Sequence, residues 1–339
     1  MKKEVIEIDG SFGTGGGQII RTAIAMSALT NKACRIKNVR AKREKPGLRP
    51  QHLTGVKAVA QLCQAKIKGA DIGSRELVFM PSKIKAGIYN FDIGTAGSIT
   101  LVLQALMPAA LHAPDIVKFN IIGGTNVPLA PSAEYFQYVF SDFLAKMGVN
   151  IKTEILRYGF FPKGGGKMKV QVKPCKKLKP LSLTERGGLI KIDCWSIASS
   201  GLKQAKVAER QIESFEKQLK QKINKKNIIY ADSPSPGTAI HTHAHYKNCK
   251  LGADTLGKRG LPAEKVGKKC ANLLLEEMKG GGVDSHAVDQ LLPFMALAGK
   301  GKILANSITE HARTNSFVIE KFLPVKFKIR DKVIEVSKV

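Results

Sequence analysis

The chain repeats one pattern of short strands and helices, and this self-similarity restricts the fold more than any other feature. Residues 4–80 contain a strand-like alternation, a glycine-rich turn at 13–17, a helical pattern, a second strand, a second helix and a closing pair of strands. The same order returns in residues 89–172 after the glycine turn at 94–97, with a helix predicted over 130–147. A chain with such a period is expected to build one domain from copies of a single β-α-β-α-β-β unit.

A third copy of the unit is interrupted. A glycine run at 280–282 precedes a helical pattern, a strand at 303–308, another helix and a hairpin that turns at Arg330 and Asp331. Residues 183–279 do not follow the pattern of the repeats. In this segment three predicted strands and two predicted helices are mixed. We therefore predict an α/β fold of the α+β type. Its large three-repeat domain comprises residues 1–182 and 280–339, and a small α/β domain, 183–279, is inserted in the third repeat.

Basic residues are in large excess. Lys and Arg number 55 and Asp and Glu 27, which gives a formal net charge of +28 at pH 7. Such a surplus favours a polyanionic partner such as nucleic acid or a phosphorylated substrate, although a lysine-rich solvated surface is the alternative. Ten basic residues and one acid, Glu44, lie between Arg35 and Lys68. This dense basic loop, close to the first glycine turn, favours a phosphate site.

The remaining composition indicates an intracellular protein. The chain has no run of about 18 apolar residues, so we expect no membrane segment. The first residues lead into a strand-like alternation and show no apolar core of a signal peptide. The six cysteines are scattered without a Cys-x-x-Cys pair, which argues against a zinc ribbon or a disulfide framework. We expect a cytoplasmic location.

Two local patterns could carry phosphate chemistry. The glycine turn at 13–17 opens a helix, where backbone N–H groups can approach a phosphate, but a plain strand-to-helix turn has the same sequence. His311 lies between an apolar strand and the next helical run. A neutral imidazole there could act as a nucleophile toward phosphorus, while a structural histidine at a helix start is the alternative.

Three alternating histidines, His241, His243 and His245, suggest a metal site at first sight. In a strand their side chains would share one face. No cysteine or carboxylate stands at a matching distance along the chain to complete a ligand set. We therefore expect an exposed strand face and predict no metal site.

Taken together, the motifs resemble the RNA 3′-terminal phosphate cyclase family, and the resemblance covers nearly the whole chain. The matching stretches are Asp9-Gly10, Gly15-Gly-Gly-Gln-Ile-Ile-Arg21, Arg40-Ala-Lys-Arg43, Pro46-Gly-Leu-Arg-Pro-Gln-His-Leu-Thr54, Thr95-Ala-Gly-Ser98 with Gln104, Gly123-Gly-Thr-Asn126, Ala130-Pro131, Gly257-Lys-Arg-Gly260, Ala263-Glu264, Val266-Gly267, Asp289-Gln290 and His311-Ala-Arg-Thr-Asn315.

The resemblance implies three β-α-β-α-β-β repeats, kinship with the enolpyruvyl transferases and a small inserted domain. It also implies an ATP-dependent enzyme that converts an RNA 3′-phosphate end into a 2′,3′-cyclic phosphate and releases AMP and diphosphate. The expected partners are ATP with Mg²⁺ or Mn²⁺ and RNA with a 3′-phosphate end. A homodimer is possible, and no membrane is involved.

The resemblance also implies roles for residues. His311 would form a covalent histidine–AMP, and an RNA–ppA end would follow. Arg21, Arg40 and Arg43 would hold phosphates, because a guanidinium binds phosphate oxygens bidentately. Gln51 and His52 would contact the RNA end. The nucleotide would be bound by Gln104, by Pro131 and His286 on the two faces of adenine, and by Ala287, Val288, Asp289 and Gln290.

One position departs from the family pattern. Thr14 stands in the glycine turn where family members carry a glutamate, the expected ligand of a divalent cation. A non-catalytic RNA-binding ribosome-assembly factor of the same fold is therefore an alternative, although His311 argues against it. An enolpyruvyl transferase is a third possibility, and the His-x-x-Thr-Asn motif and the basic loop speak against it.

Overall fold

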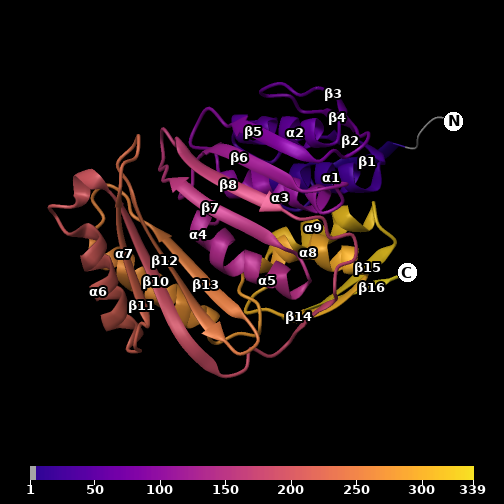
Figure 1. The fold of residues 1–339 in the computed structure, drawn as a ribbon. Coiled ribbons are helices and arrows are strands. Elements are labelled where there is room, and N and C mark those ends of the chain that lie inside the picture. The colour runs from indigo at the N-terminus through magenta and orange to yellow at the C-terminus, as the bar shows by residue number, and fades with distance from the viewer. Residues whose placement is uncertain (1–4) are drawn as a thin grey trace.

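The computed structural model describes residues 5–339, which contain four four-stranded sheets; three of them surround a set of central helices and the fourth lies beside them (Figure 1). The first repeat contains β1 (Val5–Asp9), α1 (Gly17–Thr30), β2 (Ala33–Lys37), α2 (Pro50–Leu62), β3 (Lys66–Lys68) and β4 (Leu77–Met80). Its strands lie in the order β1-β2-β4-β3. The β1–β2 pair is parallel and the other two pairs are antiparallel.

The second repeat has the same topology. It contains β5 (Gly87–Asp92), α3 (Ile99–Ala110), β6 (Val117–Gly123), α4 (Ala133–Tyr135), the π-helix η1 (Phe136–Phe140), α5 (Ser141–Lys146), β7 (Ile151–Arg157) and β8 (Gly166–Val172), in the sheet order β5-β6-β8-β7. The prediction of a single α-helix over 130–147 was wrong in two respects. The observed helix begins at Ala133, and it changes from an α-helix to a π-helix at η1. There the N–H and Oγ of Ser141 both donate to Phe136 O.

The third repeat is completed by a strand that the sequence analysis missed. It contains β9 (Leu181–Leu183), α8 (Ala287–Ala298), β14 (Lys300–Leu304), α9 (Glu310–Glu320), β15 (Val325–Arg330) and β16 (Val333–Lys338). β9 pairs in parallel with β14, so the sheet order β15-β16-β14-β9 reproduces the topology of the other repeats. The strand predicted at 303–308 ends at Leu304 instead, and residues 305–309 connect it to α9.

The inserted segment forms a sheet of its own beside the repeats (Figure 1). It contains β10 (Leu189–Ser199), η2 (Ser200–Leu202), α6 (Val207–Leu219), β11 (Lys225–Ala231), β12 (Thr238–Tyr246), β13 (Lys250–Leu256) and α7 (Ala263–Glu277), with the strand order β11-β10-β12-β13. β13 was not predicted. α6 and α7 cover one face of this sheet. The other face meets the second repeat, where Tyr138 of η1 stacks on Trp195 with ring centroids 4.5 Å apart.

Helices from all three repeats form the centre of the larger part of the molecule, where α1 packs on α3 and α9, and α8 on α9 (Figure 1). Ten of the twelve residues of α3 are buried. A helix that is apolar on all its faces is expected in such a central position. Within residues 5–339 no helix combines the length and the apolarity that a membrane crossing requires. The domain boundaries at 182/183 and 279/280 stay a prediction.

Two helical glycines should respond in opposite ways to alanine. A Cβ on Gly267 in α7 would lie 2.1 Å from Gln211 O in α6, whereas a Cβ on Gly55 in α2 would meet nothing within 4 Å. Overpacking costs about 1–3 kcal/mol, and alanine gains about 0.5–1 kcal/mol over glycine in an open helical position. We therefore expect Gly267→Ala to lower the melting temperature and Gly55→Ala to raise it. Equal shifts would contradict the close approach of α6 and α7.

Candidate functional site

The glycine turn before α1 is shaped for an anion. The Asp9 carboxylate accepts hydrogen bonds from Ser11 N and Ser11 Oγ at 2.9 and 2.8 Å, which starts the turn. Gly13 and Gly15 follow with φ of 55° and 57°, a conformation that favours glycine. Among the described residues no side chain caps α1, and its first turn contains no acidic residue. The first N–H groups of α1 are therefore available to a negatively charged group.

This turn packs directly on α9. The Phe12 and Phe317 rings are stacked with centroids 4.0 Å apart. A Cβ on Gly13 would lie 2.6 Å from Thr314 Oγ1, so only glycine allows this approach. The contact joins the beginning of the first repeat to the second helix of the third.

Asn315, which the sequence analysis quoted within a motif but gave no role, fixes three helices together. Its Oδ1 accepts a hydrogen bond from Thr22 Oγ1 of α1 at 2.9 Å, and its Nδ2 donates to Asp289 O of α8 at 3.1 Å. The side chain is buried. Thr22 and Asn315 are 293 positions apart in the sequence, so sequence spacing alone could not reveal this contact.

His311 is the second residue of α9 and is exposed. The Thr309 side chain caps the helix by accepting a hydrogen bond from Ala312 N at 3.3 Å. The cap holds the first turn of α9 in place, and His311 lies one helical turn before Thr314, which contacts the glycine turn. An exposed imidazole in this position can reach a bound ligand as a nucleophile or as a hydrogen-bonding group.

A small cavity brings together four of the predicted site residues. Its volume is about 20 Å³, enough for one water molecule, and its polar lining consists of Gln18, Arg21, Thr22, Gln104, Asp289, Gln290 and Asn315. Burial lowers the pKa of Arg21 to about 10, against the influence of Asp289, so Arg21 is still charged at pH 7. Burial raises the pKa of Asp289, whereas the charges of His311 and Arg21 oppose that shift. Arg21 and His311 therefore both lie within electrostatic range of Asp289.

His52 and Arg43 also reach the glycine turn. A Cβ on Gly17 would lie 2.3 Å from His52 Nε2, and a Cβ on Gly16 would lie 3.1 Å from Arg43 Nη2. Burial lowers the pKa of His52 to about 3, with Arg21, Arg40 and Arg49 adding to the effect, so His52 is neutral at pH 7. Its Nδ1 accepts a hydrogen bond from Arg49 N at 3.2 Å.

Two other predicted phosphate and RNA ligands have structural partners. Arg40 Nη1 donates to Lys45 O at 2.7 Å and to Gly47 O at 3.0 Å. These hydrogen bonds stabilise the conformation of the loop 40–47. Gln51 Oε1 accepts a hydrogen bond from Ser98 N at 3.2 Å and thereby links α2 to the second glycine turn. For both residues, ligand contacts remain a prediction.

The predicted adenine ligands Pro131 and His286 lie in loops that are well anchored. Pro131 O accepts a hydrogen bond from Thr100 Oγ1 at 2.8 Å. His286 is exposed and is the N-cap residue directly before α8. Gln290 is buried, and its Nε2 donates to His286 O at 2.6 Å.

Ala287 and Val288 do not present their side chains to solvent. Both are fully buried in the core. Their predicted role as nucleotide ligands stays a prediction.

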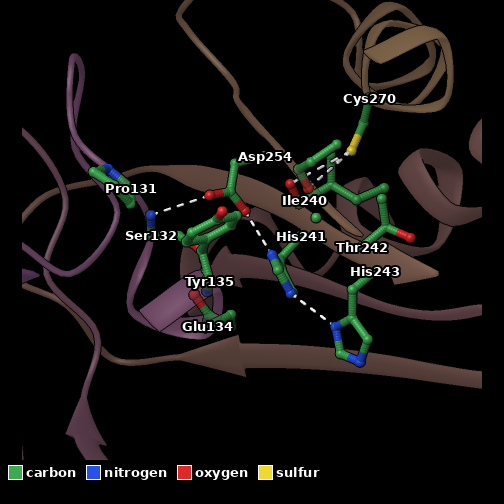
Figure 2. A network of polar contacts seen from close by, with 12 residues as sticks. Pro131, Ser132, Glu134, Tyr135, Ile240, His241, Thr242, His243, Asp254 and Cys270 are labelled. Carbon is green, nitrogen blue, oxygen red and sulfur yellow. Dashed lines mark hydrogen bonds and ion pairs between the residues drawn. The ribbon is translucent and has the colours of Figure 1, made fainter. Parts of the chain in front are cut away.

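Two carboxylates, the partly buried Asp254 and the fully buried Asp284, attach these loops to the inserted sheet. Asp254 of β13 accepts from Ser132 N at 3.1 Å and from Ser132 Oγ at 2.9 Å, directly after Pro131 (Figure 2). Asp284 accepts from Gly252 N of β13 at 3.1 Å and from His286 N at 3.0 Å. Sequence reasoning missed both acids because it missed β13.

The three histidines of β12 do not form an exposed face, contrary to our expectation. His241 and His243 are 0% and 1% exposed, because their side of the sheet packs on Tyr138 and next to Trp195. The search along the sequence also missed Asp193, which lies opposite His243 on the neighbouring strand β10.

The glycine turn contains no carboxylate for a divalent cation. Thr14 is half-buried, and its Oγ1 accepts a hydrogen bond from Gln18 Nε2 at 3.4 Å. A hydroxyl and an amide are weak ligands for Mg²⁺ compared with a carboxylate. The residues present here do not fit a cation held by the protein itself.

Known proteins are similar to this sequence over nearly its full length. Residues 12–329 match the family model described as RNA 3′-terminal phosphate cyclase. The chain is 44% identical over 341 residues to a protein of Pyrococcus abyssi named RNA 3′-terminal phosphate cyclase, covering 99% of this chain and 98% of that one. Proteins of the same name from Nitrosospira multiformis and Ignicoccus hospitalis are 42% and 43% identical, covering 95% and 94% of this chain and 93% of each relative.

The lowered pKa of His52 should appear in the pH dependence of stability. Between about pH 6.5 and pH 3 the unfolded chain binds a proton at His52 that the folded chain does not bind, so acid favours unfolding. We expect thermal melts to show a smaller loss of stability from neutral pH to about pH 4.5 in His52→Gln than in the wild type. An NMR titration in which the His52 ring takes up its proton near pH 6.5 would contradict this assignment.

Proposed function

Because the chain belongs to the RNA 3′-terminal phosphate cyclase family, we propose that it uses ATP to convert an RNA 3′-phosphate end into a 2′,3′-cyclic phosphate, with His311 as the nucleophile. The observation that carries this assignment is the exposed position of His311 in the first turn of α9, packed beside a glycine turn with free helix N–H groups.

In the first step a neutral ring nitrogen of His311 attacks the α-phosphorus of ATP. A P–N bond forms, the bridging P–O bond to the β-phosphate breaks, and diphosphate leaves with the bonding electrons. The product is a histidine–AMP phosphoramidate. The exposure of His311 supports this role, because the attacking nitrogen needs a free path to the nucleotide.

In this step, groups around the glycine turn neutralise the negative charge of the ATP phosphates. Arg21 carries its charge at pH 7, Arg43 lies against Gly16, and the first N–H groups of α1 face the same space. Fixed positive groups of this kind stabilise a transferring phosphoryl group and its leaving diphosphate. Arg40 is the third proposed phosphate ligand, and its Nη1 also holds the loop that carries Arg43.

The next two steps return His311 to its free state. An oxygen of the RNA 3′-phosphate attacks the phosphorus of the histidine–AMP, so that a P–O bond forms, the P–N bond breaks and an RNA–ppA end results. The vicinal 2′-hydroxyl then loses its proton as its oxygen attacks the 3′-phosphorus, and AMP leaves. The last step is favoured by proximity, because both reacting groups belong to one ribose.

The adenosine would be bound by a second group of residues. Gln104 lines the cavity next to Arg21, and Pro131 and His286 are the proposed partners of the adenine faces. The anchoring of both loops by Asp254 and Asp284 supports this placement, because a binding site needs its ligating groups in fixed positions. A divalent cation would be bound mainly by the phosphates of ATP, since the turn has Thr14 in place of a carboxylate.

Covalent labelling tests the proposed nucleophile. Incubation with ATP labelled at the α-phosphate, with Mg²⁺ or Mn²⁺, should give label that survives denaturation and alkali but not acid. His311→Ala should abolish the label. His286→Ala changes the other exposed histidine of the site and should still be labelled at saturating ATP. Folded wild-type protein without label under either metal would refute the mechanism and leave an RNA-binding function as the conclusion.

Thr14 offers a second test of the nucleotide site. A carboxylate at this position would bind a divalent cation directly, so Thr14→Glu should lower the metal concentration for half-maximal labelling by roughly tenfold, the effect of about 1.4 kcal/mol of added binding. Thr14→Gln is the matched control, with a similar size and no charge, and should behave as the wild type. An unchanged metal dependence in Thr14→Glu would count against any role of this position in cation binding.

A further inference from the structure

The three histidines of β12 line one buried side of the inserted sheet, away from the proposed catalytic residues. Their rings follow one another, with centroids 5.2 Å apart for His241 and His243 and 4.6 Å apart for His243 and His245. The His243 ring also stacks on Trp195 at 5.0 Å. Burial of several imidazoles in a row is costly unless their nitrogens are paired, so the partners of each nitrogen indicate what the row can bind.

One end of the row forms a compact set of three donors. The ligand atoms of Asp193, His243 and His245 all lie within 4.8 Å of one another. Asp193 Oδ2 is 3.2 Å from His245 Nε2 and 4.0 Å from His243 Nε2. Within residues 5–339 Asp193 Oδ1 has no hydrogen-bond partner, and the contact of His245 Nε2 with Asp193 Oδ2 lacks the geometry of a hydrogen bond, although Asp193 Oδ1 and His245 Nε2 are both buried. Two buried polar atoms without hydrogen bonds indicate that this cluster binds something besides protein atoms.

The other end of the row sets the protonation of His243. The Asp254 carboxylate can only accept, so the contact of 2.6 Å makes His241 Nδ1 the donor (Figure 2). The Nε2 atom of a neutral His241 then accepts from His243 Nδ1 at 3.0 Å. With its proton on Nδ1, a neutral His243 has a lone pair on Nε2, directed toward Asp193.

We propose that Asp193, His243 and His245 bind one divalent transition-metal ion, with Zn²⁺ as the first candidate. Two imidazole nitrogens and one carboxylate oxygen form a donor set that suits Zn²⁺ and related ions. Donor atoms on one tetrahedral zinc ion are roughly 3.3 Å apart, so small side-chain rotations would close the set. The Asp254–His241 pair would orient His243 from behind, as hydrogen-bonded outer groups do at many metal sites.

Lys191 competes for the same carboxylate. Its Nζ lies 2.8 Å from Asp193 Oδ2, and its side chain is 41% exposed. The ammonium group can therefore move into solvent when a metal ion takes its place. Its charge and that of Lys250 act on His245 and weaken the binding of any cation. The ion would enter beside His245, the one partly exposed member of the set. Its binding would add a link between side chains of the paired strands β10 and β12.

Cobalt substitution on the full, untagged chain tests the site without any reference to catalysis. After removal of metals with a chelator, titration with Co²⁺ should produce the visible absorption of a low-coordinate cobalt ion with one equivalent bound, and Zn²⁺ should displace it. His245→Gln and Asp193→Asn should weaken binding at least about tenfold, as loss of a metal ligand requires. His112→Gln, which changes a histidine on a distant loop, is the matched control and should bind as the wild type.

Lys191 provides the discriminating variant. Lys191→Gln removes the competing ammonium and should tighten Co²⁺ binding severalfold, an effect that surface binding to scattered histidines would not show. Zn²⁺ should also raise the melting temperature of the wild type but not of His245→Gln, a mild change because this side chain is partly exposed. The proposal is overturned if the wild type binds no Co²⁺, or if His245→Gln and the wild type bind it equally.

Discussion

The close contact between the glycine turn and α9 is the constraint on which the catalytic arrangement depends. Gly13 lies against Thr314, Phe12 stacks on Phe317, and Asn315 joins Thr22 to the backbone of α8. Helices from the first and third repeats are thereby locked together, although they lie at opposite ends of the chain. Without this contact, His311 and Arg21 would sit on separate structural units. The site is therefore a product of the way in which the repeats close on one another.

The inserted sheet supports the site through hydrogen bonds to two carboxylates, those of Asp254 and Asp284. Asp254 accepts from Ser132, and Asp284 accepts from both Gly252 and the start of α8. The loops that carry Pro131 and His286 are thus held from the same side, by a single strand, β13. Asp254 also fixes the His241 ring, so the proposed metal cluster and the proposed adenine pocket share one hydrogen-bonded network. A change in the orientation of His243 would be transmitted to Ser132 through two side chains.

The sequence predicted the repeat unit and the main helices because these depend on local periodicity. It missed β9, which has only three residues, and β13, which follows β12 after a short turn. The site was predictable where a motif joined glycine, arginine and histidine, but not where partners come from distant strands. Asp193 and Asp254 lie opposite His243 and His241 only because of strand pairing. The burial of β12 depended on η1, whose packing no pattern in β12 itself could reveal.

The electrostatics of the site explain why a polyanion is the fitting ligand. Arg21, Arg40 and Arg49 act together on His52, and with burial they keep that ring neutral over the whole physiological range. Asp289 is the acid that partly balances Arg21, and burial makes its own ionisation less favourable. A set of like charges around an uncapped helix N-terminus destabilises the empty site, and bound phosphates relieve that repulsion.

The same surplus of positive charge works against the proposed metal cluster, where Lys191 already occupies the carboxylate. The two proposed sites would therefore select opposite kinds of ion: the glycine turn would bind anions because its cations are fixed, and the histidine cluster would bind a cation because Lys191 can leave.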